Sequence, residues 1–318
     1  MRKKIFLGIA LILALVLVFL FWAPLNFGIK REIAIKSSIY NVAAEFTNLR
    51  NWKNWYPELE TADTTSFTYS ASTTAVNSFL RSGDHQYTIL QGNPAYTLVK
   101  EQSPGNKEYH SLYASPDTFG ITSRVVWIRS LSPLHWLQDK LFPRGEMDTA
   151  LQHLKRFMED PSQYYSFPIS IVPVEDTLVL TITKVSSKKD RIMTLLGLYQ
   201  ELHEFGKLNR IDLGQTPMAS FNLLVSDSIL ISAGIPVSQK GPVKKGVAYL
   251  SMPKMGRIVK GSYEGPYPGI KRLYAAMEKF IFDKRLQKIA LPYEKYISGP
   301  PSLTDSGNVR INLCFPVL

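Results

Sequence analysis

The sequence of 318 residues contains a single cysteine, Cys314, so the chain forms no internal disulfide. Its five histidines include no pair spaced i,i+4 and no His-Glu-x-x-His motif, and this spacing gives no support to a metal site. Motifs typical of serine hydrolases, P-loop nucleotide binding and dinucleotide binding are also absent. These absences lead us to expect no metal and no other cofactor, and they leave no residue marked as catalytic.

An uncharged apolar run stands at the N-terminus. Arg2 to Lys4 precede it, it extends from Ile5 to Trp22, and Pro24 follows it. At 1.5 Å per residue such a helix spans about 27 Å, close to the thickness of a bilayer core. We expect residues 1–28 to be an uncleaved membrane anchor, with the N-terminus cytoplasmic and the bulk extracytoplasmic. A cleaved signal peptide is the alternative, although the run ends without a good cleavage site.

The net charge of +11 is concentrated in the C-terminal half. Residues 167–318 hold 20 of the 37 basic and 12 of the 26 acidic side chains. This excess is typical of a solvated basic face. Binding to nucleic acid needs clustered basic residues interleaved with aromatics, whereas Lys188-Lys189 and Lys244-Lys245 are only pairs. We therefore expect no nucleic-acid partner.

Residues 29–162 show the pattern of an antiparallel sheet followed by a helix. An alternating strand at 29–36 and a short Ser-capped helix through Val42 and Phe46 come first. Five short strand patterns then follow, at 74–80, 86–90, 95–100, 108–114 and 121–130. The segment ends with a predicted amphipathic helix at 146–159, which has an apolar stripe beginning at Met147.

This order of elements resembles the SRPBCC superfamily, which includes START-like and polyketide-cyclase-like domains. The resemblance is carried by residues 33–56, with Asn51 to Trp55 followed by Tyr56 and Pro57, and by the final helix. It implies a helix-grip sheet around that helix, with an apolar cavity for lipid-like or aromatic ligands. The alternative is that Trp52, Trp55 and Trp127 form an ordinary core.

Residues 163–318 contain an internal repeat. The helix pattern with Leu198-Tyr199 recurs as Leu273-Tyr274, an offset of 75. The closing strand Ile231–Val237 recurs as Ile311–Val317, an offset of 80. We expect two strand-helix-strand-strand units about a pseudo-twofold axis, each covering the sheet of the other, with a pocket where they meet.

The second repeat resembles the GyrI-like effector-binding domain. The segments that carry the resemblance are Gly261–Tyr267, Leu273-Tyr274, Tyr293–Tyr296 and Ile311–Val317. In that family an acidic residue reaches an aromatic pocket that contacts cationic or polar ligands. By position, the resemblance assigns this role to Glu294.

Six residues are the candidate ligand-binding set, namely Glu294, Tyr296, Tyr263, Tyr267, Tyr274 and Tyr199. A partly desolvated carboxylate among tyrosine faces is a receptor for a cation. The alternatives are that Glu294 pairs with a nearby lysine or lies exposed on a strand edge, and that the tyrosines belong to the core.

Together these patterns predict an α+β protein with three parts: an N-terminal transmembrane helix (1–28), a helix-grip antiparallel sheet domain (29–162) and a duplicated GyrI-like domain (163–318). The expected function is membrane-anchored binding or sensing of a small apolar, amphipathic or cationic molecule. The expected partners are that ligand and a membrane contacted through residues 5–22. A hydrolase or cyclase-type enzyme with Glu294 as general base is the alternative. A structural module with filled pockets is a third reading.

Overall fold

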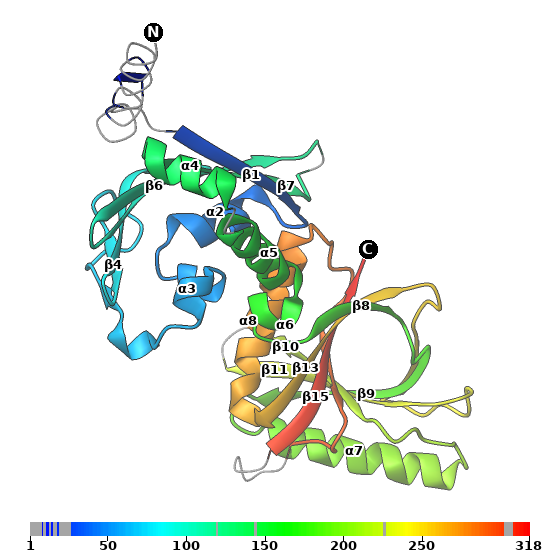
Figure 1. Cartoon of the computed structure of the whole chain (residues 1–318). Coiled ribbons are helices and arrows are strands. Elements are labelled where there is room, and N and C mark those ends of the chain that lie inside the picture. Colours follow the sequence, from blue (N-terminus) through cyan, green and yellow to red (C-terminus); the bar gives the residue numbers. More distant parts are fainter. Residues whose placement is uncertain are drawn as a thin grey trace. The chain divides into compact units, whose positions relative to one another are not determined.

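The chain divides into two compact units, Met1–Asp160 and Pro161–Leu318. The computed structural model describes residues 8, 11–12, 14, 18, 27–118, 120–142, 145–224, 227–301 and 308–318. Both units are α+β, and each contains one antiparallel sheet (Figure 1).

The apolar run predicted to anchor the chain lies mostly outside the described residues. Within the part of the chain that is described, no helix is both long and apolar enough to cross a membrane. The expected transmembrane helix therefore finds no support, and the orientation predicted with it stays a prediction.

The first unit is built on a seven-stranded sheet in the order β1-β7-β6-β5-β4-β3-β2. Its strands are β1 (Phe27–Ile35), β2 (Thr68–Tyr69), β3 (Phe79–Ser82), β4 (His85–Asn93), β5 (Tyr96–Ser103), β6 (Asn106–Pro116) and β7 (Ser123–Leu131). Strands β2 to β7 form a meander, because each strand pairs with the next one along the chain. Every second residue of β7 is buried, so one face of the sheet is covered.

Helices cover that face, and the sheet curves around them (Figure 1). The helical elements are α2 (Ile39–Thr47), η1 (Trp52–Asn54), α3 (Pro57–Glu60), η2 (Thr64–Ser66), α4 (Pro133–Leu141) and α5 (Glu146–Glu159). The predicted stripe on α5 is buried, including Met147, Leu151 and Leu154. The side chain of Ser38 accepts a hydrogen bond from the amide of Asn41 and caps α2, as its position predicted.

Aromatic side chains fill the space in which an apolar cavity was expected. Trp52, Trp55 and Trp127 are each at most 2% exposed. The rings of Trp52 and Trp55 lie 5.3 Å apart, and Trp52 Nε1 donates to the carbonyl of Phe46 at 3.0 Å. A cavity of about 150 Å³ remains beside Glu58 and Arg129. Among the described residues, the core alternative for these tryptophans therefore describes the unit better than a large ligand cavity does.

The second unit repeats the order strand-helix-strand-strand. Its elements are α6 (Pro161–Tyr164), β8 (Ile169–Pro173), β9 (Leu178–Ser187), α7 (Arg191–Leu208), β10 (Met218–Leu223), β11 (Ser228–Pro236), β12 (Val247–Ser251), β13 (Arg257–Pro266), η3 (Tyr267–Gly269), α8 (Ile270–Asp283), β14 (Tyr293–Tyr296) and β15 (Asn308–Val317). The first repeat is β9-α7-β10-β11 and the second is β13-α8-β14-β15.

The two repeats join edge to edge into one eight-stranded sheet, in the order β12-β9-β11-β10-β14-β15-β13-β8. The expectation that each repeat covers the sheet of the other was wrong. The two repeats instead exchange edge strands. Strand β8 comes just before the first repeat but pairs with β13 of the second, and β12 comes just before the second repeat but pairs with β9 of the first. Strands β10 and β14 pair at the centre.

The offset of 75 extends to backbone detail at the helix ends. Arg210 and Arg285 have the left-handed φ values of 53° and 54°. The next amide in each repeat returns to the helix, from Ile211 to Gly206 at 2.9 Å and from Leu286 to Ile281 at 3.0 Å. A left-handed residue after a helix is a common terminator, and glycine is the residue that adopts it most easily.

Both α7 and α8 pack on one face of the sheet, and the core of the unit lies between them and the strands. Gly261 of β13 permits the close approach of α8. A Cβ atom at this position would lie 2.6 Å from the sulfur of Met277 and 2.8 Å from Leu273.

We expect Arg210→Gly to stabilise the second unit by about 0.5–1 kcal/mol, because glycine removes the strain of the left-handed backbone. All five tryptophans precede residue 161, so unfolding of this unit is best followed by pulse-labelling hydrogen exchange in urea. The matched control is Glu201→Gly on the exposed face of α7, which should lose about 1 kcal/mol. An equal loss in Arg210→Gly would contradict the argument.

Candidate functional site

Glu294 lies at the centre of the sheet of the second unit. It stands on β14 between Ala219 of β10 and Leu313 of β15. Because side chains alternate along a strand, Glu294 and Tyr296 point toward the helices while Tyr293 and Lys295 point to the other face. Glu294 is only 2% exposed. The alternative of an exposed residue on a strand edge is therefore wrong.

Three tyrosine hydroxyls hold the carboxylate of Glu294. Tyr267 of η3 donates to Oε2 at 3.0 Å, and Tyr296 of β14 donates to the same oxygen at 2.8 Å. Tyr274 of α8 donates to Oε1 at 3.0 Å. We call Glu294 with these three residues the tyrosine cage. Three separate elements thus converge on one carboxylate.

The cage gives Glu294 neutral partners. Among the ion pairs of the described residues none involves Glu294, and Lys295 pairs with Glu175 and Asp176 on the opposite face. Burial raises the pKa of Glu294, and the three hydroxyl donors and the charge of Arg191 oppose this rise only in part. Burial also raises the pKa of Tyr267 and Tyr274, so both phenols remain donors at neutral pH.

The other two predicted tyrosines occupy different positions. Tyr199 of α7 donates to the carbonyl oxygen of Met218 at 2.5 Å, and the charge of Glu294 contributes, after burial, to the rise in its pKa. Tyr263 of β13 donates to the carbonyl of Pro266 at 2.6 Å, and within the described part of the chain its hydroxyl does not contact Glu294. The geometry therefore joins three of the five predicted tyrosines to Glu294, with Tyr199 beside them.

The cage lies at the axis of the repeat. With the offset of 75, Glu294 corresponds to Ala219, its own cross-strand partner. Tyr274 corresponds to Tyr199, and Tyr296 corresponds to Phe221. Of the two residues related by the repeat, only Glu294 carries a carboxylate. The other, Ala219, is its cross-strand neighbour and has only a methyl side chain.

Two hollows border the central strands without reaching Glu294. One, of about 390 Å³, is apolar and lies on the opposite face of the sheet, where Met218, Ser220 and Tyr293 line it. The other, of about 500 Å³, is lined by Tyr263, Ile297 and Ile311 among others. Ile311 pairs directly with Tyr296 of the cage, so this second hollow begins one strand away from it.

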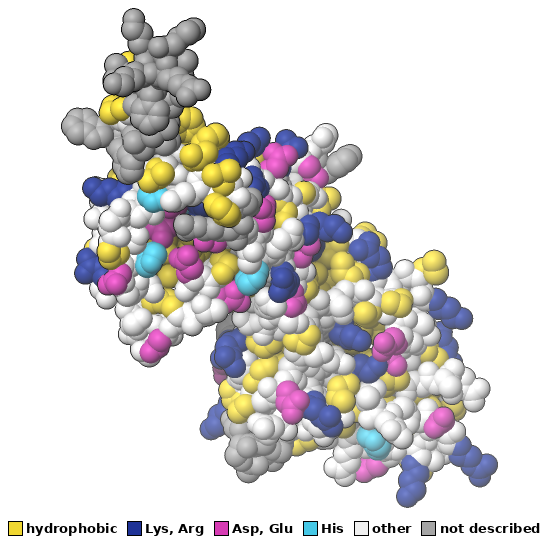
Figure 2. All heavy atoms as spheres, in the orientation of Figure 1, with side chains coloured by type: hydrophobic (Ala, Val, Ile, Leu, Met, Phe, Trp, Pro, Cys, Tyr) yellow, Lys and Arg dark blue, Asp and Glu magenta, His cyan; other side chains and the backbone are white. Residues whose placement is uncertain are grey.

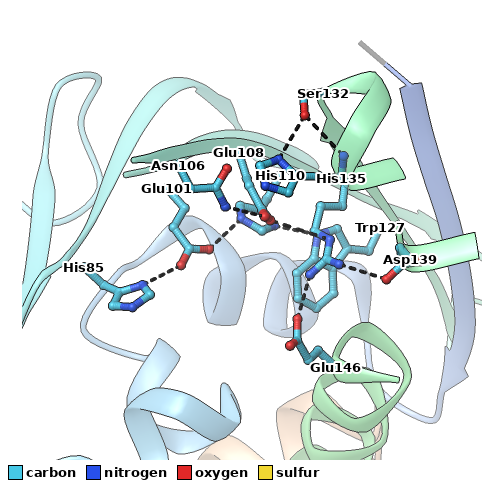
Figure 3. Close-up of polar contacts among 11 residues, drawn as sticks. His85, Glu101, Asn106, Glu108, His110, Trp127, Ser132, His135, Asp139 and Glu146 are labelled. Carbon is cyan, nitrogen blue, oxygen red and sulfur yellow. Dashed lines mark hydrogen bonds and ion pairs between the residues drawn. The ribbon is translucent and has the colours of Figure 1, made fainter. Parts of the chain in front are cut away.

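A second polar cluster lies on the covered face of the sheet in the first unit (Figure 3). Glu101 of β5 lies between two histidines, with Oε1 at 2.8 Å from His85 Nδ1 and Oε2 at 2.9 Å from His110 Nε2. Glu58 and Glu108 complete two groups of residues whose ligand atoms are close enough to hold a metal ion.

Sequence reasoning missed this cluster because it looked for metal ligands spaced as on a helix. The cluster could have been found from the register of the hairpin formed by β5 and β6. Glu101 and Glu108 are equally distant from the turn at 104–105 and pair across β5 and β6. His110 follows Glu108 by two residues and therefore shares its face.

Comparison with known proteins gives only coarse fold matches. No family model matches the chain, and no curated protein matches it significantly. A solved complex of EcmrR with DNA has a TM-score of 0.42 and 16% identity, covering 57% of this chain and 67% of that one. The EcmrR C-terminal domain has a TM-score of 0.38 and 16% identity, covering 48% and 98%. CalU16 from Micromonospora echinospora has a TM-score of 0.34 and 12% identity, covering 42% and 75%. Matches at these scores assign this chain neither a family nor a ligand.

The partners expected from the sequence need correction on two points. A membrane contact through residues 5–22 is not upheld, because no helix in the described ranges can span a bilayer. The exclusion of nucleic acid is withdrawn, since one of the similar structures is a protein solved with DNA. That contact is a property of EcmrR.

We expect Glu294→Gln to change how stability depends on pH. Because the folded-state pKa of Glu294 is raised, the wild type loses stability relative to the variant as pH rises from about 4.3 to the folded-state pKa. For each unit by which the folded-state pKa exceeds the unfolded value, the wild type loses about 1.4 kcal/mol of its free energy of unfolding. Unfolding in urea at each pH, with a labelling pulse at one fixed pH, measures it. Glu201→Gln, on the exposed face of α7, should show no such slope; a wild type that gains stability with pH would contradict the raised pKa.

Proposed function

We propose that residues 161–318 bind a small organic cation with apolar substituents, and that Glu294 pairs with its charge. The observation that carries the proposal is a carboxylate, 2% exposed, whose hydrogen-bond partners are three neutral phenols. A buried carboxylate without a countercharge destabilises a protein. A ligand cation supplies that countercharge, so the cage favours a positive ligand over a neutral one of the same shape.

The residues around Glu294 suit an organic cation better than a hydrated metal ion. The hydroxyls of Tyr267, Tyr274 and Tyr296 contact the carboxylate, so three aromatic rings lie near it, and aromatic faces attract cations that are weakly hydrated. The donors that hold the carboxylate can rotate away when a cation replaces them. Nitrogen or thiolate ligands, which a transition metal prefers, do not contact Glu294 among the described residues.

Entry to the cage requires side chains to move, because Glu294 is 2% exposed and lines neither of the two hollows described above. The hollow at Tyr263 and Ile311 offers the shorter route, since Ile311 is the neighbour of Tyr296. Tyr263 thereby has a role in this proposal at the entrance and not in the cage. We infer that ligand binding displaces Tyr267 of η3 and Tyr274 of α8, whose hydroxyls contact the carboxylate.

The positive charge of this half opposes a cation only at long range. On the face seen in Figure 2, the Lys and Arg side chains of the unit are separated from one another by side chains of other kinds. Salt screens such surface charges beyond about 8 Å. At contact distance the buried carboxylate therefore dominates.

We expect the full chain to bind benzyltrimethylammonium more tightly than neopentylbenzene, its uncharged isostere, as measured by calorimetry or by displacement of a dye. Glu294→Gln should weaken binding of the cation at least tenfold, or about 1.4 kcal/mol, and leave the weak binding of the isostere unchanged. Affinity for the cation should rise with pH through the raised pKa of Glu294.

Glu201→Gln is the matched control, because it removes one negative charge from the surface of the same unit. Equal affinity for the cation and the isostere, or equal loss in both glutamine variants, would contradict the assignment of Glu294 as the receptor.

A further inference from the structure

Three side chains of the first unit converge at the end of the covered face. Glu58 belongs to α3, His85 begins β4 and Glu101 lies on β5. One ligand atom from each lies within 4.8 Å of the other two. We call these residues the His85 cluster. His85 is 43% exposed and Glu101 12% exposed, so the cluster is open to solvent on one side.

Hydrogen bonds from Trp127 to His110 and from His110 to Glu101 hold the side of Glu101 that faces away from His85 (Figure 3). Trp127 Nε1 lies 3.2 Å from His110 Nδ1, and a tryptophan nitrogen only donates. His110 Nδ1 is therefore the acceptor, and Nε2 carries the proton that it donates to Glu101 Oε2 at 2.9 Å. His110 is thus a neutral support for Glu101 and has no lone pair to offer an ion. The second group, formed by Glu101, Glu108 and His110, is therefore excluded as a metal site, because it depends on His110 as a ligand.

Glu58 is also held by a neutral hydrogen-bond donor. Tyr87 donates to Glu58 Oε2 at 3.0 Å, and the ring of Tyr87 stacks with His85 at 6.4 Å and 19°. Each carboxylate of the cluster therefore has one oxygen held by a neutral donor. The other oxygen remains for the interior of the cluster. Outer partners of this kind orient the ligands of metal sites.

Negative charge exceeds positive charge around the cluster. The guanidinium of Arg129 contacts Glu146 at 2.8 Å, Asp139 at 3.3 Å and Glu108 at 3.6 Å. Among the ion pairs of the described residues, neither Glu58 nor Glu101 pairs with a lysine or an arginine, and Glu101 pairs only with His85 and His110. When the histidines are neutral, the two carboxylates of the cluster lack a full countercharge.

We propose that Glu58, His85 and Glu101 bind a divalent ion of the zinc class. An imidazole with two carboxylates suits borderline ions such as Zn²⁺, whereas Mg²⁺ and Ca²⁺ prefer oxygen alone. Ligand atoms of a tetrahedral zinc lie about 3.3 Å apart, given bonds of about 2.0–2.1 Å. His85 Nδ1 and Glu101 Oε1 are 2.8 Å apart, so the ion replaces their shared proton after a shift of about 0.5 Å. Three protein ligands leave one position open to water.

The test is calorimetry on the tag-free full chain, treated with a chelator and titrated with Zn²⁺ and, separately, with Mg²⁺. We expect one saturable Zn²⁺ site per chain and much weaker binding of Mg²⁺. His85→Ala and Glu58→Gln should each weaken Zn²⁺ binding at least tenfold. Thermal unfolding of both apo variants, followed by tryptophan fluorescence, verifies that they fold, since all five tryptophans precede residue 161.

His153→Ala is the matched control. His153 Nδ1 lies 2.7 Å from Glu60 Oε2 in the same unit, so it forms the same kind of pair, but it belongs to neither group of close ligand atoms. This variant should bind Zn²⁺ as the wild type does. Co²⁺ gives an independent readout, because a four-coordinate site produces strong visible absorption that His85→Ala should abolish.

Three results would overturn the proposal. They are no saturable binding of Zn²⁺, equal binding of Zn²⁺ and Mg²⁺, and loss of the site in His153→Ala with retention in His85→Ala.

Discussion

The alternation of side chains along one central strand directs a carboxylate into the covered face of the second unit. Tyr296 must point inward to fill the core, and Glu294 lies two positions before it on the same face. The buried acid then requires donors, which η3, α8 and β14 supply through their tyrosines. Because Tyr274 of α8 donates to Glu294, the packing of α8 on the sheet depends in part on this carboxylate. A ligand that competes for the carboxylate also competes with this contact.

The two units treat a buried glutamate in different ways, and the difference indicates different ligands. Glu101 is held between two histidines and lies near a guanidinium that other acids already share. Imidazole beside carboxylate is chemistry that suits a metal ion. Glu294 is held by three phenols, which suits a cation that has lost its water. We therefore propose two classes of positive ligand for one chain, each in its own unit.

The sequence predicted the structure well where a segment follows a single helical or strand periodicity in its apolar residues. The helix at 146–159 was placed at its true ends. The GyrI-like resemblance put Tyr274 and Tyr296 in one candidate set with Glu294, and both donate to its carboxylate. The edge-strand exchange between the repeats was not predictable, because it depends on which partner β8 and β12 find. The grouping of His85, Glu101 and His110 was missed because residues 9 and 16 positions apart meet only through hairpin register. Tyr263 lies outside the cage because its hydroxyl bonds locally to the turn at Pro266.

The central claim is that Glu294 is buried without a full countercharge. Carbon-13 NMR of glutamate side-chain carboxyl groups across a pH series tests it most directly, with the signal assigned by its loss in Glu294→Gln. The account predicts a titration midpoint well above the ordinary value of about 4.3, and a lower midpoint when an organic cation is bound. A midpoint at or below the ordinary value in the free protein would contradict the account.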